Sequence, residues 1–490
     1  MNLYKKCIVT RIRRFVMNKK QVISLLLAVI LVVGLMAVPA AAEESKAPES
    51  GYPFVFVHGL LGFGERADAN TLLPYWGMSS GSIVDYLTRL GYESYAAQVG
   101  PISSAWDRAC ELYAQLTGTT VDYGIAHSAE KDHARFGVTY DKPLFSGWGP
   151  DKKINLVGHS FGGASIRMFL DILADGCPEE VAAAEAAGEK VSPFFEGGKS
   201  NWVYSLTAIA APHNGTTFFE ACKLSSTMIP ALIYDYGSAL KMTPFSNFYD
   251  LQLEHFGVSR NEGESDQEYL TRVLYSEKYK GHHDNALEDL TIDCALDIND
   301  GIEIRDDIYY FSVAGDTTHD SKDGNKRVPN DETFVLAKGF SSKMGKYCGK
   351  YTAGGFYIDE SWLPNDGLVN VVSALYPVNS SGECLKQDGS CGYAFKEWDS
   401  TEFEKGVWNV MPVVPYDHIA IVGGVFNNSM TNVRALYLDI VENIVSTYDG
   451  GAVSDPVLSS FTFKFIDNGM WAQLFHMIVN ARNLLAKLFM

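Results

Sequence analysis

The sequence predicts an α/β fold in which a central, mostly parallel sheet is flanked by helices. Three segments predict buried strands: FVFV at 54–57, INLV at 154–157, and a strand within WVYSLTAIAAPHNGT at 202–216. They alternate with stretches of helical periodicity, which is typical of a parallel α/β sheet. The first run is wholly apolar, and the second carries Ile154, Leu156 and Val157, as expected for strands that are buried on both faces.

The first predicted strand leads directly into the loop HGLLG at 58–62. In hydrolases built on such a sheet, a glycine-containing loop after an early strand supplies one backbone N–H for an oxyanion. Leu60 is the candidate donor in this loop.

The second predicted strand ends in the pentapeptide GHSFG at 158–162, which places Ser160 between a strand and a helix. A sharp strand–turn–helix lifts a serine hydroxyl clear of the sheet and needs small residues beside it. We therefore interpret Ser160 as a nucleophile and the N–H of Phe161 as an oxyanion donor. The alternative is a tightly packed glycine-rich turn without chemistry. A second pentapeptide of this pattern, around Ser79, follows Pro74 and no clean strand, so it is not favoured.

The middle of the chain, from about 216 to 300, departs from the strand–helix alternation. Its first part, around Met228 to Met242, is apolar on most sides, and 257–300 is polar and charged. The apolar part is either a buried helical layer or a lid over an apolar site. Strands resume after Asp307 with IYYFSVAG, and the domain closes with the helix NVRALYLDIVENIVSTY.

The first 42 residues carry seven bases and no acid, with an apolar run at 22–38 before Ala40-Ala41-Ala42. This pattern predicts a signal peptide that is cleaved after Ala42, and hence a secreted protein. An uncleaved membrane anchor is the alternative. We expect a single domain over 43–448, followed by a tail at 449–490 that either contacts lipid as an interfacial helix or docks on the domain.

Charge and cysteine content narrow the class of protein. The chain carries a net charge of −19, and removal of the seven leader bases makes it −26. So acidic a protein is not expected to bind nucleic acid, because the phosphates would repel it.

Seven cysteines follow the leader, so at least one thiol is free in a secreted chain. Cys384 and Cys391 flank a short polar loop and can pair, or all seven can be reduced.

A nucleophilic serine needs a base and an orienting carboxylate, which follow it in the order Asp, His in this architecture. His418 lies within VMPVVPYDHIAIVGG between two apolar stretches, whereas His319 lies in a polar loop and His476 in the tail. Asp366 lies in WLPNDGLVN at the edge of an apolar run. The rivals for the carboxylate are Asp417, Asp316 and Asp320.

His127 and His133 form a second cluster of functional residue types. Their spacing of six excludes a shared helix face, but a loop can bring both to one ion. Zinc favours imidazole nitrogens with carboxylate oxygens. Four acids that could complete such a site lie nearby in the sequence: Asp107, Asp122, Glu130 and Asp132. The alternative is that both histidines are surface residues.

Six motifs in order give the chain a resemblance to the secreted true lipases of Gram-positive bacteria, the Bacillus/Geobacillus and staphylococcal group. They are VHGLLGFG, VGPISSAWDRACELYAQLTGTTVDYGIAHSAEKDHARFG, GHSFGG, APHNGTT, LPNDGLVN and YDHIAIVG, and they span about 53 to 448. The resemblance implies an α/β-hydrolase fold with a helical lid. It implies a triad of Ser160, Asp366 and His418, and oxyanion donors at Leu60 and Phe161. It also implies a structural zinc ion, with the ligands Asp107, His127, His133 and, in NFYDLQLEHFG, Asp250.

Two departures from this family have consequences. The family holds a calcium ion with acidic residues shortly after the catalytic histidine, but here Ala420 and Val425 stand at those places. We therefore expect that the calcium site is lost. Phe161 stands where these lipases often carry a polar residue, and because the donor is a backbone N–H, catalysis should survive.

These observations predict a secreted triacylglycerol lipase that hydrolyses acylglycerols through a Ser–His–Asp triad. An esterase for short soluble esters on the same fold is the nearest alternative. A non-catalytic secreted binding protein is the alternative from another class.

Overall fold

The computed structural model describes residues 51–67, 70, 74–78, 81–223, 250–282, 284–382, 395–424 and 430–448. All of these belong to one compact unit, residues 1–452. Several predictions fall outside the described residues: the signal peptide, the Ser79 motif, the apolar segment at 228–242, the Cys384–Cys391 pair, Val425 and the tail at 449–490. None of the described helices has the length and hydropathy needed to cross a membrane.

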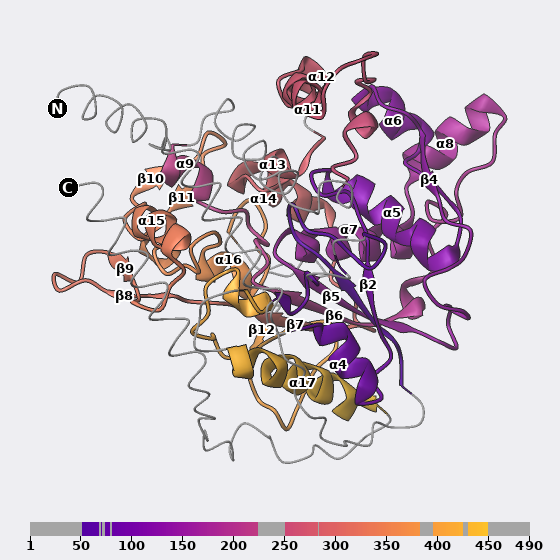
Figure 1. Ribbon diagram of the computed structural model, residues 1–490. Helices are drawn as coiled ribbons and strands as arrows, with labels where there is room; N and C mark the ends of the chain where they lie inside the picture. Colours follow the sequence, from indigo (N-terminus) through magenta and orange to yellow (C-terminus); the bar gives the residue numbers. More distant parts are fainter. Residues whose placement is uncertain are drawn as a thin grey trace, which may run out of the picture. The chain divides into compact units, whose positions relative to one another are not determined.

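A seven-stranded sheet with the order β12-β13-β7-β6-β5-β1-β2 forms the centre of the molecule. Each neighbouring pair in it is parallel, which confirms the predicted parallel sheet (Figure 1). Its strands are β1 (Phe54–Val57), β2 (Ser94–Ala97), β5 (Ile154–His159), β6 (Val203–Ile209), β7 (Tyr309–Val313), β12 (Phe395–Glu397) and β13 (Trp408–Val410).

Three two-stranded antiparallel ribbons and a set of helices complete the fold. The ribbons are β3 (Thr120–Asp122) with β4 (Phe136–Thr139), β8 (Thr318–Asp320) with β9 (Arg327–Pro329), and β10 (Lys350–Tyr351) with β11 (Tyr357–Ile358). The helices are α4 (Ile83–Arg89), α5 (Ala105–Thr117), α6 (Ile125–Lys131), α7 (Phe161–Asp175), α8 (Pro178–Ala187), α9 (Phe218–Cys222), α11 (Asp266–Leu274), α12 (Glu277–Gly281), α13 (Ala286–Asp289), α14 (Ile292–Gly301), α15 (Val335–Met344), α16 (Val371–Leu375) and α17 (Met430–Ser446), with short 3-10 turns at η3 (Ser200–Trp202), η5 (Leu253–Phe256), η6 (Glu360–Trp362) and η7 (Ala420–Val422).

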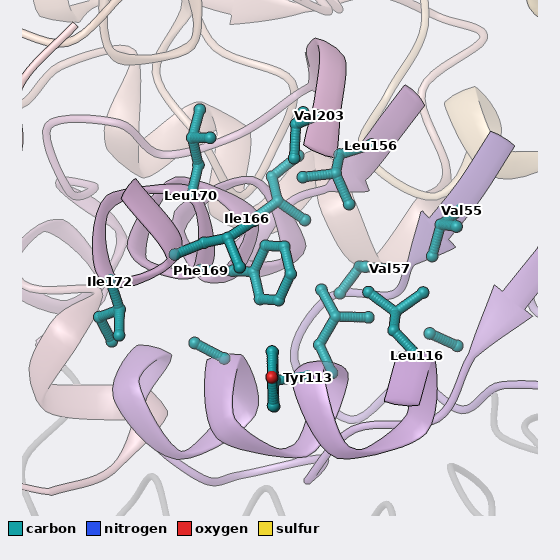
Figure 2. Close-up of a cluster of buried hydrophobic side chains, with 14 of the residues drawn as sticks. Val55, Val57, Tyr113, Leu116, Leu156, Ile166, Phe169, Leu170, Ile172 and Val203 are labelled. Carbon is teal, nitrogen blue, oxygen red and sulfur yellow. The ribbon is translucent and has the colours of Figure 1, made fainter. Parts of the chain in front are cut away.

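Both faces of the sheet are covered, because successive strand residues point to opposite sides. On one face, Val55 and Val57 of β1 pack with residues of α5 and α7. Figure 2 shows Phe169 of α7 near both the strand residue Val57 and Tyr113 of α5. On the other face, residues of β1, β5 and β7 pack against α4 and α17, which lie below the sheet in Figure 1. This two-sided burial explains why apolar residues are frequent on both faces of the central strands.

The turn between β5 and α7 is tightly packed against the sheet. A Cβ atom on Gly162 would lie 2.1 Å from the carbonyl oxygen of Val57 in β1. A Cβ atom on Gly163 would lie 2.3 Å from the Cβ of Ala211, just beyond β6. Only glycine lets the start of α7 approach the sheet this closely.

We expect Gly162→Ala to lower the free energy of unfolding by roughly 1–3 kcal/mol, because the added methyl group overpacks the turn. Urea unfolding followed by circular dichroism measures this. The matched control is Gly339→Ala in α15, where an added Cβ meets nothing within 4 Å. That change should be neutral or stabilising by about 0.5–1 kcal/mol, since glycine weakens a helix. Equal stability of the two variants would contradict the packing argument.

Candidate active site and metal centre

Ser160 has a backbone conformation that residues other than glycine rarely adopt. Its φ is 55° and its ψ is −130°, directly between the end of β5 and the start of α7. Its N–H donates to the carbonyl oxygen of Ile209 in β6 at 2.9 Å. Non-glycine residues persist in such regions only where the surroundings impose the conformation, and such strain is concentrated at functional sites. The predicted strand–turn–helix around Ser160 is present.

A chain of hydrogen bonds joins Ser160, His418 and Asp366. His418 Nε2 lies 2.8 Å from Ser160 Oγ, and His418 Nδ1 lies 2.7 Å from Asp366 Oδ2. The serine is only 8 % exposed, the aspartate 1 % and the histidine 5 %, so bulk water does not compete for these bonds. The structure thus brings together three residues that are far apart in the sequence.

The loop around Asp366 holds its carboxylate in one orientation. Asp366 Oδ1 accepts from the N–H groups of Leu368 at 2.9 Å and Val369 at 2.7 Å, which leaves Oδ2 to His418. The backbone N–H of His418 also donates to the carbonyl oxygen of Asp366 at 3.0 Å. Two short contacts therefore fix the distance between the two residues.

The rival carboxylates have other partners. Asp417 accepts from the backbone N–H groups of Ile419, Ala420 and Phe334 at 2.9–3.1 Å. Asp316 and Asp320 both pair with Arg327. Within the described residues, these three carboxylates are held by backbone N–H groups and Arg327, not by the imidazole of His418.

The two predicted oxyanion donors flank Ser160. Phe161 follows it in the chain, and the loop that carries Leu60 passes over it: a Cβ on Gly59 would lie 2.7 Å from Ser160 Cβ. Within the described residues, the N–H groups of Leu60 and Phe161 donate no backbone hydrogen bond. Both are available to an oxygen atom held above Ser160.

Arg108 supports this loop from inside the protein. Its guanidinium donates to the carbonyl oxygens of His58 and, at 3.3 Å, of Gly100. The same group lies over the ring of Phe161, with its carbon atom 4.9 Å from the ring centroid. The aromatic ring at position 161 thus contacts a buried cation.

His58 is a buried neutral imidazole in the same loop. Its Nδ1–H donates to the carbonyl oxygen of Gly59 at 2.9 Å, and its Nε2 accepts from the N–H of Val99 at 3.3 Å. Burial, and then the Arg108 guanidinium, lowers the pKa of His58 to about 3.

This lowered pKa makes stability depend on pH with a definite sign. The unfolded chain takes up a proton at His58 below a pH of about 6.5, whereas the folded protein does not until a pH of about 3. Stability from this group is therefore complete above pH 6.5 and is lost as the pH falls toward 3. We expect the stability lost between pH 7 and pH 5 to be smaller in His58→Gln by about 2 kcal/mol. Urea unfolding at both pH values checks this, and equal losses in wild type and variant would refute it.

A second group of polar side chains lies beside α5. One ligand atom from each of Asp107, His127, His133 and Asp284 lies within 4.8 Å of the others. Asp107 Oδ1 is 3.3 Å from His127 Nε2, and Asp284 Oδ2 is 3.2 Å from His133 Nε2. Asp107 Oδ1 and the Nε2 atoms of both histidines are buried without a hydrogen-bond partner in the described structure. Buried polar atoms without partners that converge on one point fit a bound metal ion.

The predicted ligand Asp250 is wrong as a member of this group, and Asp284 takes the fourth position. Asp250 is exposed, and its Oδ1 accepts from the N–H of Gln252. Asp284 is buried immediately before α13, where the fold brings it to the histidines.

His255 is a further residue at this site that the sequence did not indicate. It lies in η5, and its Nε2 is 2.6 Å from Asp107 Oδ2, on the opposite oxygen from the cluster. This contact orients Asp107 with Oδ1 toward the two ligand histidines, in the way that outer partners orient metal ligands.

We expect Asp284→Asn to lose bound metal and Asp250→Asn to retain it. The amide removes a negative charge from the first site, whereas the second residue is outside the cluster. Metal analysis of protein purified without chelator measures the content, and the thermal midpoint with and without EDTA reports its contribution to stability. The reverse result, with metal lost only in Asp250→Asn, would restore the ligand set suggested by the resemblance.

Comparisons with known proteins agree with this geometry. The family described as "Lipase-like, C-terminal domain" matches residues 50–451. The lipase of Staphylococcus epidermidis is 34 % identical over 384 residues, which is 78 % of this chain and 51 % of that protein. The lipase of Staphylococcus hyicus is 34 % identical over 390 residues, covering 79 % of this chain and 56 % of the relative. The chain thus spans about half the length of the curated relatives it matches.

Two solved structures share the fold. The crystal structure of Staphylococcus hyicus lipase has a TM-score of 0.68 at 31 % identity, over 83 % of this chain and 98 % of that one. EstA from Clostridium botulinum has a TM-score of 0.71 at 32 % identity, over 84 % of this chain and 92 % of that one. They confirm the α/β-hydrolase fold.

Proposed function

Because the chain belongs to the family "Lipase-like, C-terminal domain", we propose that it is a triacylglycerol lipase that uses Ser160, His418 and Asp366 as its catalytic triad. The observation that carries this proposal is the hydrogen-bonded chain from Ser160 Oγ to His418 at 2.8 Å and from His418 to Asp366 at 2.7 Å. Two hydrogen bonds of this kind are common in proteins and do not by themselves indicate catalysis. Here they lead to a serine with a strained backbone, beside two N–H groups that donate no backbone hydrogen bond to a described residue.

The geometry implies the order of proton transfers. His418 Nε2 takes the proton from Ser160 Oγ as that oxygen attacks the ester carbonyl carbon. Asp366 accepts a hydrogen bond from the Nδ1–H of His418, which fixes the tautomer of the imidazole and stabilises the imidazolium. The N–H groups of Leu60 and Phe161 donate to the carbonyl oxygen as it becomes an oxyanion. His418 then protonates the leaving alcohol oxygen, which leaves an acyl-enzyme on Ser160.

Deacylation repeats the path with water. His418 removes a proton from water, the hydroxide attacks the acyl carbonyl carbon, and the same two N–H groups hold the second oxyanion. The imidazolium returns its proton to Ser160 Oγ as the fatty acid leaves.

The surroundings of the oxyanion donors support a lipid substrate. Leu60 and Phe161 belong to an apolar cluster whose other members come from α5, α7, α9 and α13. An acyl chain entering beside Ser160 would meet apolar side chains, which favours long hydrocarbon over charged groups. The cluster contains Ala105, Phe219, Ala286 and Leu290, with Ala164, Met168, Phe218 and Leu287 packed against it.

We further propose zinc as the metal ion. Two imidazole nitrogens and two carboxylate oxygens, from Asp107, His127, His133 and Asp284, match the donors and the number of a tetrahedral zinc site. With four protein ligands, no position remains for water. The ion would therefore be structural, and it would join α5 to the segments that carry the other ligands.

The remaining proposals concern the whole protein. The leader pattern at 1–42 supports secretion, with a lipase domain at 43–448, a helical lid within about 216–300, and a tail at 449–490 that can contact lipid. Ala420, which offers no carboxylate after His418, supports loss of the family's calcium site. Activity and stability that do not change with added calcium would agree with this.

The decisive experiment compares emulsified long-chain triacylglycerol with a soluble short-chain ester. Ser160→Ala should lose at least about 10³-fold in kcat on both, since it removes the nucleophile. Ser165→Ala is the matched control: Ser165 is a buried serine of α7, the helix that follows Ser160, and its hydroxyl donates to the carbonyl oxygen of Phe161. Wild-type cleavage of the soluble ester alone would leave an esterase with the same triad. Full activity of Ser160→Ala would reject the proposed site.

A further inference from the structure

We propose that Tyr75 and His159 are positioning residues that connect the oxyanion loop, which comprises residues 58–62, to His418 through a continuous chain of hydrogen bonds. The inference rests on the function proposed above, but it concerns two residues that the reaction itself does not use. Both side chains are buried, and among the described residues the hydrogen-bond partner of Ser160 Oγ is His418 rather than either of them.

The chain of bonds runs from the loop to the backbone of His418. The N–H of Gly59 donates to Tyr75 Oη at 2.9 Å. Tyr75 Oη lies 2.6 Å from His159 Nδ1, and His159 Nε2 lies 3.1 Å from the carbonyl oxygen of His418. The rings of His159 and His418 also pack together, with centroids 4.7 Å apart.

The chemistry of the groups allows one direction for the protons. A carbonyl oxygen only accepts, so His159 Nε2 must carry the hydrogen that it donates to His418. Burial, and then the neighbouring His418, lowers the pKa of His159 well below its usual value, so its Nδ1 carries a lone pair. The Tyr75 hydroxyl therefore donates to Nδ1 and accepts from Gly59. Every donor in the chain has an acceptor.

This chain of hydrogen bonds joins two parts of the proposed active site, the oxyanion donor and the catalytic base. Gly59 precedes Leu60, the proposed oxyanion donor, and a Cβ on Gly59 would lie 2.7 Å from Ser160 Cβ. The other end is the residue whose imidazole takes the serine proton. The chain thus fixes the distance between the oxyanion donor and the base across Ser160. Misplacement by about 1 Å can reduce a rate roughly 10²-fold.

Tyr75 has the rigid surroundings that such a role requires. Its ring packs edge-on against Trp76 and Phe63, with centroids 5.4 and 6.0 Å apart. The same core offers a control, because Tyr437 is also a buried tyrosine but its hydroxyl has no hydrogen-bond partner among the described residues. Comparing Tyr75→Phe with Tyr437→Phe therefore separates the loss of the Tyr75 hydrogen bonds from the general effect of removing a buried hydroxyl group from this core.

The experiment measures kcat and KM on a soluble short-chain ester, together with thermal midpoints, for Tyr75→Phe and Tyr437→Phe. We expect Tyr75→Phe to lower kcat about 10–100-fold with KM nearly unchanged, because the bonds position groups that act in the transition state. Tyr437→Phe should keep the wild-type kcat. Equal kcat values in the two variants, or a change in KM alone, would overturn the proposal.

Two substitutions of His159 test the links one at a time and decide the matter if Tyr75→Phe does not fold. His159→Gln carries an amide near the position of Nε2 and can still donate to His418, whereas His159→Asn carries one near Nδ1 and can still accept from Tyr75. Each should retain part of the kcat that His159→Ala loses. The proposal is wrong if both are as impaired as His159→Ala, or if His159→Ala is fully active.

Ser160→Ala is assayed beside them so that the two proposals fail separately. An inactive Ser160→Ala with a fully active Tyr75→Phe rejects the positioning chain and leaves the triad. An active Ser160→Ala rejects both.

Discussion

The left-handed backbone of Ser160 is the constraint on which the rest of the site depends. This conformation turns the chain from the end of β5 into α7 within one residue, and it requires the helix to start almost in contact with β1. Glycine at 162 and 163 makes that approach feasible. In return, the serine hydroxyl leaves the plane of the sheet, and the N–H of Phe161 comes to the start of a helix, where no backbone acceptor competes for it.

Helix α5 connects the two functional regions through neighbouring residues. Asp107 belongs to the candidate metal-binding group, whereas Arg108 reaches the carbonyl oxygen of His58 and the ring of Phe161. The oxyanion loop is thus held by Arg108 on one side and by Tyr75 with His159 on the other. A substitution that shifts the first turn of α5 would disturb both regions, so the metal content and the turnover of a variant should be interpreted together.

Local patterns were sufficient for part of this arrangement. The apolar strand and the glycines after it are short-range signals, and they predicted the strand, turn and helix around Ser160 correctly. Asp284 could not be found in this way, because it lies in a charged stretch where acids are common and only tertiary packing brings it to the histidines. The Tyr75–His159 contact joins residues 84 positions apart, and the strand order depends on which neighbours pack best. Such long-range pairings leave no periodic trace in a sequence.

The neutral imidazole of His58 has a consequence for the stability of the protein as the product of the proposed reaction accumulates. Each turnover of the proposed reaction releases a carboxylic acid, which acidifies a weakly buffered droplet as hydrolysis proceeds. The oxyanion loop contains a group that the folded protein keeps unprotonated down to a pH of about 3 but the unfolded chain does not. Accumulating product would therefore lower the free energy of unfolding, because the unfolded chain binds a proton that the folded protein does not.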